Sequence, residues 1–466
     1  MMKFASTLAA AFLLASIAQA QSRPDQTAFR ALYKELVETN TQASNGSCTL
    51  AADRMAARLK AAGFPESDLT RFAAPEFPKN GGLVAVYPGR DPKAKAILLL
   101  AHIDVVEARP EDWVRDPFTL VEEGGYFYAR GASDDKAQAA IWVDSLIRYR
   151  AEGFKPRRVI KMALTCGEEG GSPFNGAAWL TQNRRELIDA AFALNEGGGG
   201  SLDEHGKRIA HGVEAGEKTS QSFTLEVTNP GGHSSRPVPD NAIYHLADAL
   251  TRIRGYEFPV QLSDVTRGYL TQMSKIAGVE TGAAMTALVA DPTNRQANAR
   301  LSADPSLNNI LRTTCVATML SGGHAQNALP QRATATINCR IFPGETAAAV
   351  RATLIKVIGD PAVSVSQPTE RPAIAGPPLT REVMAPIEAL TQQMWPGVPV
   401  VPMLLAPGTD GTALIAAGIP TYGVSGLFFE PDLGHIHGLN ERIGVTSLYE
   451  GRDFLYRLVK IYAGQK

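Results

Sequence analysis

Five short segments of the sequence concentrate side chains that can bind metal ions or transfer protons. The first contains His102 and Asp104, directly after the continuous apolar run ILLLA. The other four place acidic residues or histidine beside glycine: residues 130–136 (RGASDDK), 165–171 (TCGEEGG), 195–198 (NEGG) and 435–441 (HIHGLNE). Imidazole and carboxylate groups together are ligands that zinc and other borderline divalent metals prefer. The segments therefore predict a metal-dependent site.

The elements around these segments bring them to one edge of a sheet. Strands are predicted at residues 95–107, 159–166 and 191–195, with helices at 136–149 and 176–188 between them. This alternation predicts an α/β fold with a mostly parallel sheet and helices on both faces. The acidic and histidine residues fall just past strands, where open α/β sheets bind ligands. Three ligand carboxylates packed together need cations to neutralise them, and a fourth could then act as a general base.

The pattern changes to α+β after residue 217. Strands of period two are predicted at residues 222–228 (SFTLEVT), 313–319 and 334–341, with helices at 242–254 and 346–358 and a last strand at 362–366. The α/β pattern resumes with a helix at 381–394, a strand at 420–424 and a closing helix at 447–462. We therefore expect a catalytic domain of residues 21–216 and 373–466, interrupted by a lid or dimerisation domain of residues 217–372.

Composition and charge exclude several classes of protein. The 466 residues are 44% hydrophobic and 20% charged, which is typical of soluble globular proteins with a sizeable core. The 46 basic and 47 acidic residues leave a formal charge of -1, which argues against a nucleic-acid partner or a polybasic membrane contact. Four cysteines exclude a disulfide-dense scaffold.

Residues 1–20 have the features of a signal peptide. Lys3 precedes an apolar run at residues 8–17, and Ala18-Gln19-Ala20 is an A-x-A cleavage signature. A membrane anchor is the alternative, but a run of about ten apolar residues is shorter than the roughly 20 that span a bilayer. We expect cleavage after Ala20 and an exported mature protein, periplasmic or secreted, without a membrane contact.

The motifs AHIDVV, RGASDDK, TCGEEGG, LNEGGGG and HGLNE, in this order, resemble metallopeptidase family 20. This dizinc group includes aminoacylase, succinyl-diaminopimelate desuccinylase, carnosinase and glutamate carboxypeptidase. The resemblance covers nearly the whole mature chain. The segments LRTTCVATML, GGHAQNALP and NCRIFPGET are most similar to the Gly-X carboxypeptidase and N-acyl-amino-acid hydrolase branch.

The resemblance implies a set of residues that hold two zinc ions, with Co²⁺ or Mn²⁺ as alternatives. Asp134 would bridge the ions. One ion would be held by His102, Asp134 and Glu196, and the other by Asp134, Glu169 and His437. The spacing H-G-x-N-E favours His437 over His435 as the last ligand.

The resemblance also implies roles beside the metals. Glu168 would be the general base, and Asp104 would orient His102. The peptide bond after Asp134 is expected to be cis. Gly167 departs from the family pattern, since many members carry Asp there.

The inserted domain would recognise the substrate. His233, in the segment GGHSS, matches the lid histidine that stabilises the oxyanion, and the substrate carboxylate would be bound by Asn327, Arg340, Gly408 and Thr409. An arginine fork and backbone amides suit a carboxylate, although a strand-surface cation is the alternative for Arg340. We expect a homodimer in which His233 serves the active site of the partner subunit. The alternatives are a monomer in which the long insert of residues 258–312 lets His233 act in cis, and a solvated histidine in a glycine turn.

The remaining histidines and cysteines have simpler interpretations. His205, His211, His245 and His324 have no motif partner and are expected on the surface or in the core. Cys315 and Cys339 lie on strands that could form a hairpin. An exported protein permits a disulfide there, but two free thiols are the favoured interpretation.

The combined prediction is an exported dizinc metallopeptidase or amidohydrolase. It would hydrolyse the amide bond of short peptides or N-acyl amino acids that have a free C-terminal carboxylate. A co-catalytic zinc aminopeptidase is the alternative enzyme, although that group lacks a large insert before the last ligand. A binding protein without metal on the same scaffold is the alternative of another class.

Overall fold

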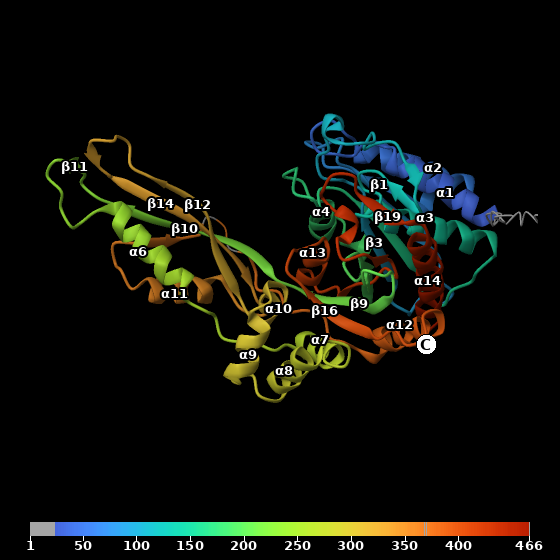
Figure 1. The fold of residues 1–466 in the computed structure, drawn as a ribbon. Helices are drawn as coiled ribbons and strands as arrows, with labels where there is room; N and C mark the ends of the chain where they lie inside the picture. The colour runs from blue at the N-terminus through green and yellow to red at the C-terminus, as the bar shows by residue number, and fades with distance from the viewer. Residues whose placement is uncertain (1–23, 368, 370, 466) are drawn as a thin grey trace, which may run out of the picture.

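The computed structural model describes residues 24–367, 369 and 371–465. The predicted signal peptide, residues 1–20, lies outside the described residues. Figure 1 shows a larger part, called here the catalytic part, and an elongated lid that extends from it. The long strands β9 (Arg208–Glu217) and β10 (Thr219–Thr228) follow each other across the junction. Within the described part of the chain, no helix is long and apolar enough to cross a membrane.

The catalytic part is organised around a mixed sheet of ten strands. The order is β1-β2-β6-β3-β7-β17-β9-β8-β18, and β16 pairs with β9. The central strands β6, β3, β7 and β17 run parallel. The remaining bounds are β1 (Leu69–Phe72), β2 (Gly82–Tyr87), β3 (Ile97–His102), β6 (Ile160–Thr165), β7 (Phe192–Asn195), β8 (Gly200–Leu202), β16 (Val400–Leu405), β17 (Thr421–Gly423) and β18 (Phe428–Phe429).

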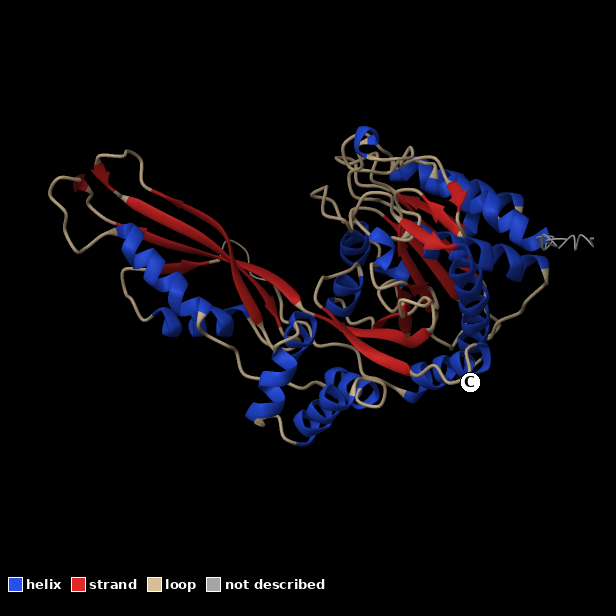
Figure 2. Ribbon diagram, in the orientation of Figure 1, coloured by secondary structure: helices blue, strands red, loops and turns tan. Residues whose placement is uncertain are grey.

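Helices cover both faces of this sheet (Figure 2), and its central strand β3 is buried at every position. Alternate residues of a strand face opposite sides. Leu99 of β3 packs in one core cluster with α1, α2, α3, α12 and α14, whereas Leu100 packs in another with α4 and α13. The fold predicted from the alternating pattern is therefore confirmed. The helices are α1 (Pro24–Val37), α2 (Cys48–Ala61), α3 (Lys136–Ala151), α4 (Gly176–Asn183), α5 (Arg185–Ile188), α12 (Arg381–Met394), α13 (Gly411–Ala416) and α14 (Val445–Gly464).

A small antiparallel sheet lies next to the last motif, residues 435–441. Its order is β19-β5-β4, and it joins a hairpin to the segment that follows the last motif. The strands are β4 (Val121–Glu123), β5 (Tyr126–Tyr128) and β19 (Arg442–Gly444).

The lid is the α+β unit that the period-two segments predicted. Its antiparallel sheet has the order β12-β14-β10-β15. The helices α6 and α11 pack on it through a separate apolar core that contains Phe223, Ile337, Leu246 and Val350. A short pair of strands, β11 and β13, forms the tip of the lid (Figure 1). The bounds are β11 (Gly232–His233), β12 (Thr314–Gly322), β13 (Ala328–Leu329), β14 (Arg332–Ile341), β15 (Ser364–Ser366), α6 (Ala242–Arg254) and α11 (Ala347–Ile358).

The long insert of residues 258–312 folds into four helices with an apolar core of their own. They are α7 (Asp264–Met273), α8 (Val279–Ala290), α9 (Arg295–Ser302) and α10 (Pro305–Leu311). Helix α7 packs closely on β16, since a Cβ atom on Gly268 would lie 2.6 Å from Pro402. The insert therefore packs against the catalytic part at the base of the lid.

All four cysteines are paired, so the free-thiol interpretation of Cys315 and Cys339 is wrong. These two residues lie directly opposite each other on β12 and β14 and form a disulfide. Period-two patterning identified both strands, but it does not give the register that aligns the two residues. A second disulfide joins Cys48 to Cys166, across 118 residues of sequence, and no local pattern predicted it.

Candidate active site and metal centre

The sequence segments with acidic and histidine residues meet at the carboxyl ends of three adjacent parallel strands. Strand β3 ends at His102, β6 ends at Thr165 and β7 ends at Asn195. Their parallel pairing places the residues that follow each strand at one edge of the sheet. Asp134 and His437 come to the same place from loops.

Asp134 lies between the two histidines that were predicted as ligands. Its Oδ1 is 3.0 Å from His102 Nε2, and its Oδ2 is 3.1 Å from His437 Nε2. His437 Nε2 is also 2.9 Å from Glu169 Oε2, and His102 Nε2 is 3.7 Å from Glu196 Oε1. A carboxylate with one imidazole on each oxygen has the arrangement expected of a group that bridges two cations.

The donor set fits two borderline divalent cations. Two groups of potential ligand atoms each lie within 4.8 Å: His102 with Asp134 and Glu169, and His102 with Glu168 and Glu196. Neutral imidazole and carboxylate oxygen together are the donors that zinc accepts at such spacing. The division of these residues between two ions stays a prediction.

The carboxylates at this edge destabilise each other's charge. Burial, with the negative charges of Glu196, Asp410 and Glu169, raises the pKa of Glu168 to about 9. Burial, with the charge of Asp134 among others, raises the pKa of Glu196 to about 7. Such a cluster holds its protons unless positive charge enters the site. The electrostatics therefore favour cation binding.

Asp104 fixes the orientation of His102 on the side away from Asp134. His102 Nδ1 lies 3.1 Å from the carbonyl oxygen of Asp104 and 3.6 Å from its carboxylate Oδ1. The other carboxylate oxygen accepts a hydrogen bond of 3.1 Å from the backbone N–H of Glu169. Asp104 therefore connects a histidine of the site to the loop that carries Glu168 and Glu169.

Glu441 is a structural residue of the site to which the sequence analysis gave no role. Its Oε2 accepts from Arg130 Nη1 at 2.8 Å and from Gly131 N at 2.9 Å. Its Oε1 accepts from Ser133 N at 2.9 Å and from Asp134 N at 3.1 Å. The peptide bond between Asp134 and Asp135 is cis, as expected from the resemblance. One buried carboxylate thus joins the turn of Asp134 to the loop of His437, and its place at the end of HGLNE was the available signal.

Asp410 is a second buried residue without a predicted role. Its Oδ2 accepts from Thr165 Oγ1 and its Oδ1 accepts from Asn175 Nδ2, each at 2.6 Å. Asn175 Nδ2 also donates to the carbonyl of Gly167 at 3.3 Å. Asp410 therefore supports the start of the loop of the two glutamates through Asn175.

The departure at Gly167 has a steric reason in this chain. Its φ is +90°, and a Cβ atom there would lie 1.9 Å from the carbonyl oxygen of Phe174. Only glycine adopts this conformation at such a close approach without strain.

A family model described as Peptidase family M20/M25/M40 matches residues 98–461 of the chain. The chain belongs to this family. It is 27% identical over 415 residues to the human N-fatty-acyl-amino acid synthase/hydrolase PM20D1, covering 85% of this chain and 80% of that protein. It is 29% identical over 392 residues to a probable carboxypeptidase S-like 2 of Dictyostelium discoideum, covering 82% and 74%.

A solved structure shows the same fold. An M20 family metallo-carboxypeptidase from Sulfolobus solfataricus aligns with a TM-score of 0.68 at 19% identity, covering 95% of this chain and all of that one. The chain is thus an M20 metallohydrolase, and the family acts on peptides or N-acyl amino acids.

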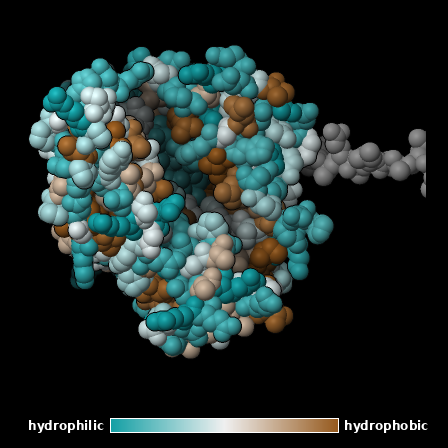
Figure 3. Space-filling model, turned by 60° about the vertical axis from the view of Figure 1, so that its left-hand side comes forward, coloured by the Kyte–Doolittle hydropathy of each residue, from teal (hydrophilic) through white to brown (hydrophobic). Residues whose placement is uncertain are grey.

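In this M20 protein a cavity of about 720 Å³ extends from the loop of Glu168 to the base of the lid. Glu168, Arg340, Gly408 and Thr409 all line it. Figure 3 shows the hollow between the lid, which comes forward, and the catalytic part. The amide and hydroxyl of Thr409 both donate to Glu217, so its direct contact with substrate stays a prediction.

The other predicted recognition residues lie elsewhere. His233 and the segment of Asn327 are adjacent at the tip of the lid, where Ser234 N donates to Asn327 O at 3.0 Å. Figure 1 shows this tip at the end of the lid that points away from β3. The structure therefore does not bring these two residues to the edge that carries the predicted ligands of the same chain.

The remaining histidines have contacts outside the site. His435 Nε2 lies 3.2 Å from Asp432, and His245 lies between Asp240 and Asp360 on the lid. His211 is fully buried against aromatic rings of the catalytic core.

Proposed function

We propose that this protein is an exported dizinc amidohydrolase that cleaves short peptides or N-acyl amino acids with a free C-terminal carboxylate. The observation that carries the proposal is that Glu168 and Arg340 line one cavity. A proton acceptor and a cation in the same cavity suit an amide whose leaving amino acid retains its carboxylate. The names of the two relatives, an acyl-amino-acid hydrolase and a carboxypeptidase, agree with this substrate class.

His102, Asp134 and Glu196 would hold one zinc ion, and Asp134, Glu169 and His437 the other. Bound zinc supplies the positive charge that polarises a scissile carbonyl and lowers the pKa of water. Glu168 accepts a proton at its carboxylate from the attacking water and donates it to the leaving amine. Asp104 holds the ring of His102 in place through its contacts at Nδ1.

The edge of the lid sheet supports a homodimer. Strand β12 lies at the edge of that sheet, and its side chains Val316, Met319 and Leu320 are 61–70% exposed. An exposed apolar edge strand is a pairing site for another chain. A second copy paired along this edge would let His233 and Asn327 serve the active site of the partner subunit. Their position at the tip of the lid keeps both residues away from the site of their own chain.

The two disulfides support export. Disulfides persist in oxidising compartments and are rare in the cytosol. Together with the signal peptide predicted at residues 1–20, they favour a periplasmic or secreted protein.

The substrate assignment is tested with paired substrates that differ only in a free C-terminal carboxylate or its amide. We expect hydrolysis of the free acids, with kcat/KM well above that of the amides. Arg340→Met should remove this preference by raising KM for the acids roughly 10- to 150-fold, the range for a lost charged hydrogen bond. Arg371→Met changes another cation that lines the cavity and is the matched control. Equal turnover of acids and amides by the unaltered protein contradicts the proposal.

The dimer is tested by complementation. His233→Ala and Glu168→Ala should each be nearly inactive alone. After subunit exchange, half of the dimers would be mixed with one complete site each, so about a quarter of the original activity should return. No recovery after verified exchange would show that His233 acts in cis or not at all.

A further inference from the structure

The Cys48–Cys166 disulfide reaches the loop that carries the predicted base. Cys48 is the first residue of α2, and Cys166 directly follows β6. Glu168 and Glu169 follow Cys166 after a single glycine. The bond therefore ties the start of this loop to a helix that lies far away in sequence.

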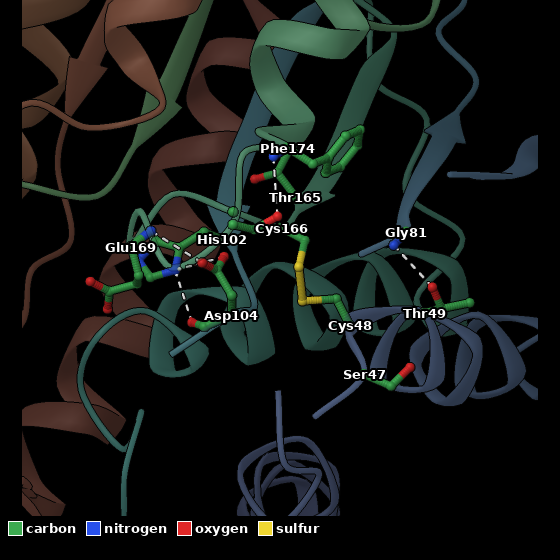
Figure 4. Close-up of a disulfide and its surroundings, with 12 residues drawn as sticks. Ser47, Cys48, Thr49, Gly81, His102, Asp104, Thr165, Cys166, Glu169 and Phe174 are labelled. Carbon is green, nitrogen blue, oxygen red and sulfur yellow. Dashed lines mark hydrogen bonds and ion pairs between the residues drawn. A yellow bond between two sulfur atoms is a disulfide. The ribbon is translucent and has the colours of Figure 1, made fainter. Parts of the chain in front are cut away.

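The same disulfide lies against Asp104. Both sulfur atoms and a carboxylate oxygen of Asp104 lie within 4.8 Å of one another. Figure 4 shows the disulfide on one side of Asp104, with His102 and Glu169 on the other. Asp104 contacts His102 and accepts a hydrogen bond from Glu169 N. A displacement of Cys166 would therefore shift two predicted metal ligands through Asp104.

Besides the disulfide, the loop is held by hydrogen bonds from Asn175 Nδ2 to the carbonyl of Gly167 and from Glu169 N to Asp104, but it is rich in glycine. Gly167, Gly170 and Gly171 flank the two glutamates, and the first two have φ of +90° and +73°. Glycines give the free chain many more conformations than other residues do. A covalent attachment at Cys166 removes much of that freedom before any ligand binds.

The disulfide is buried, but it borders a cavity beside the site. Cys48 and Cys166 line a cavity of about 260 Å³, together with Asp104, Glu169 and the loop glycines. By contrast, the Cys315–Cys339 disulfide lies between β12 and β14 of the lid. The chain therefore contains a disulfide at the site and a second one away from it, which serves as a control.

We propose that the Cys48–Cys166 disulfide is a positioning element, and that the chain gains full affinity for its metals only after this bond forms. The inference rests on the proposed dizinc function. In the reduced chain, two thiols replace the bond, and the loop of Glu168 and Glu169 samples other conformations. Oxidation transfers two electrons and two protons from these thiols to a disulfide oxidant, which becomes a dithiol. Activity is thereby linked to arrival in an oxidising compartment.

The test compares Cys48→Ala/Cys166→Ala with the matched control Cys315→Ala/Cys339→Ala. Zinc affinity is measured by competition with chelators of graded strength, and circular dichroism verifies folding. We expect the first variant to lose 10- to 100-fold in affinity for the more weakly held zinc, the range for lost support of a ligand. Its kcat should fall by a similar factor while KM stays nearly unchanged. The control should keep both affinities and kcat within about twofold.

A second measurement covers the case in which the first variant does not fold. The folded control variant, which retains only the Cys48–Cys166 bond, is reduced with a phosphine. The phosphine takes oxygen from water and leaves two thiols, which mass spectrometry detects after alkylation. Zinc affinity should fall on reduction and return on reoxidation. Unchanged zinc affinity in the reduced, folded protein overturns the inference. An oxidised protein that binds two zinc ions but cleaves no tested substrate would instead contradict only the proposed function.

Discussion

Replacing Glu441 should destabilise the catalytic part and weaken both metal sites together. The side chains of Glu441 and Arg130 are 1% and 3% exposed, and their ion pair is 2.8 Å long. Glu441→Ala leaves the guanidinium buried, with the carbonyl of Gly438 as its remaining hydrogen-bond acceptor at 2.8 Å and the ring of Trp113 beneath it. It also removes the acceptor for the backbone N–H groups of residues 131, 133 and 134.

The expected loss can be estimated from these contacts. Removing one partner of a buried ion pair costs about 3–5 kcal/mol, because the other charge remains desolvated. The orphaned N–H groups add to this, but relaxation and water entry offset part of their contribution. We therefore expect Glu441→Ala to lower the free energy of unfolding by about 4 kcal/mol. Arg130→Met/Glu441→Gln, which removes both charges, should recover part of the loss.

The sequence offers a convenient probe for this measurement. All four tryptophans, Trp113, Trp142, Trp179 and Trp395, lie outside residues 217–372, so their fluorescence follows denaturation of the catalytic part. Unfolding is measured in chelator to separate stability from metal binding, and zinc affinity is measured separately. A loss below about 1 kcal/mol, or unchanged zinc affinity, would refute the reasoning that Glu441 holds the two ligand loops together.

Three further predictions follow from the site and the core. Dialysis against a strong chelator should abolish hydrolysis and added Zn²⁺ or Co²⁺ should restore it; full activity in protein shown to be metal-free by elemental analysis contradicts the site. Glu168→Ala should keep both metals and lose at least about 10²–10⁴-fold in kcat, whereas Glu169→Ala should also lose metal; two metals bound equally by both variants would show that the role assignment within the pair is wrong. Burial lowers the pKa of His211 to about 3 in the folded protein, against about 6.5 for an ordinary histidine. Between these two pH values the unfolded chain binds a proton at His211 that the folded protein does not. The contribution of His211 to the free energy of unfolding is therefore fully present above about pH 6.5 and is lost as the pH falls toward about 3. His211→Gln should reduce the slope of this decline by up to about 1.4 kcal/mol per pH unit; the same slope in both proteins would exclude His211 as the cause.

The sequence by itself determined the family, the alternating catalytic fold and the candidate site. The buried strand ILLLAH is apolar at all but its last position, and the residues at and after its end must lie at the edge where parallel strands end. His102, Glu168 and Glu196, which lie at or just after the ends of β3, β6 and β7, could therefore be placed near one another from local patterns alone. The lid strands were also predicted, because alternation with period two is a local property.

Tertiary structure alone decided which distant residues support that site. The register of β12 and β14 aligns Cys315 with Cys339, and the packing of α2 on the sheet brings Cys48 to Cys166. The carboxylate of Glu441 reaches the turn of Asp134 across roughly three hundred residues of chain, a distance that no local pattern spans. Local patterns report which face of an element is buried, whereas register, disulfide pairing and buried ion pairs depend on how separate elements pack together.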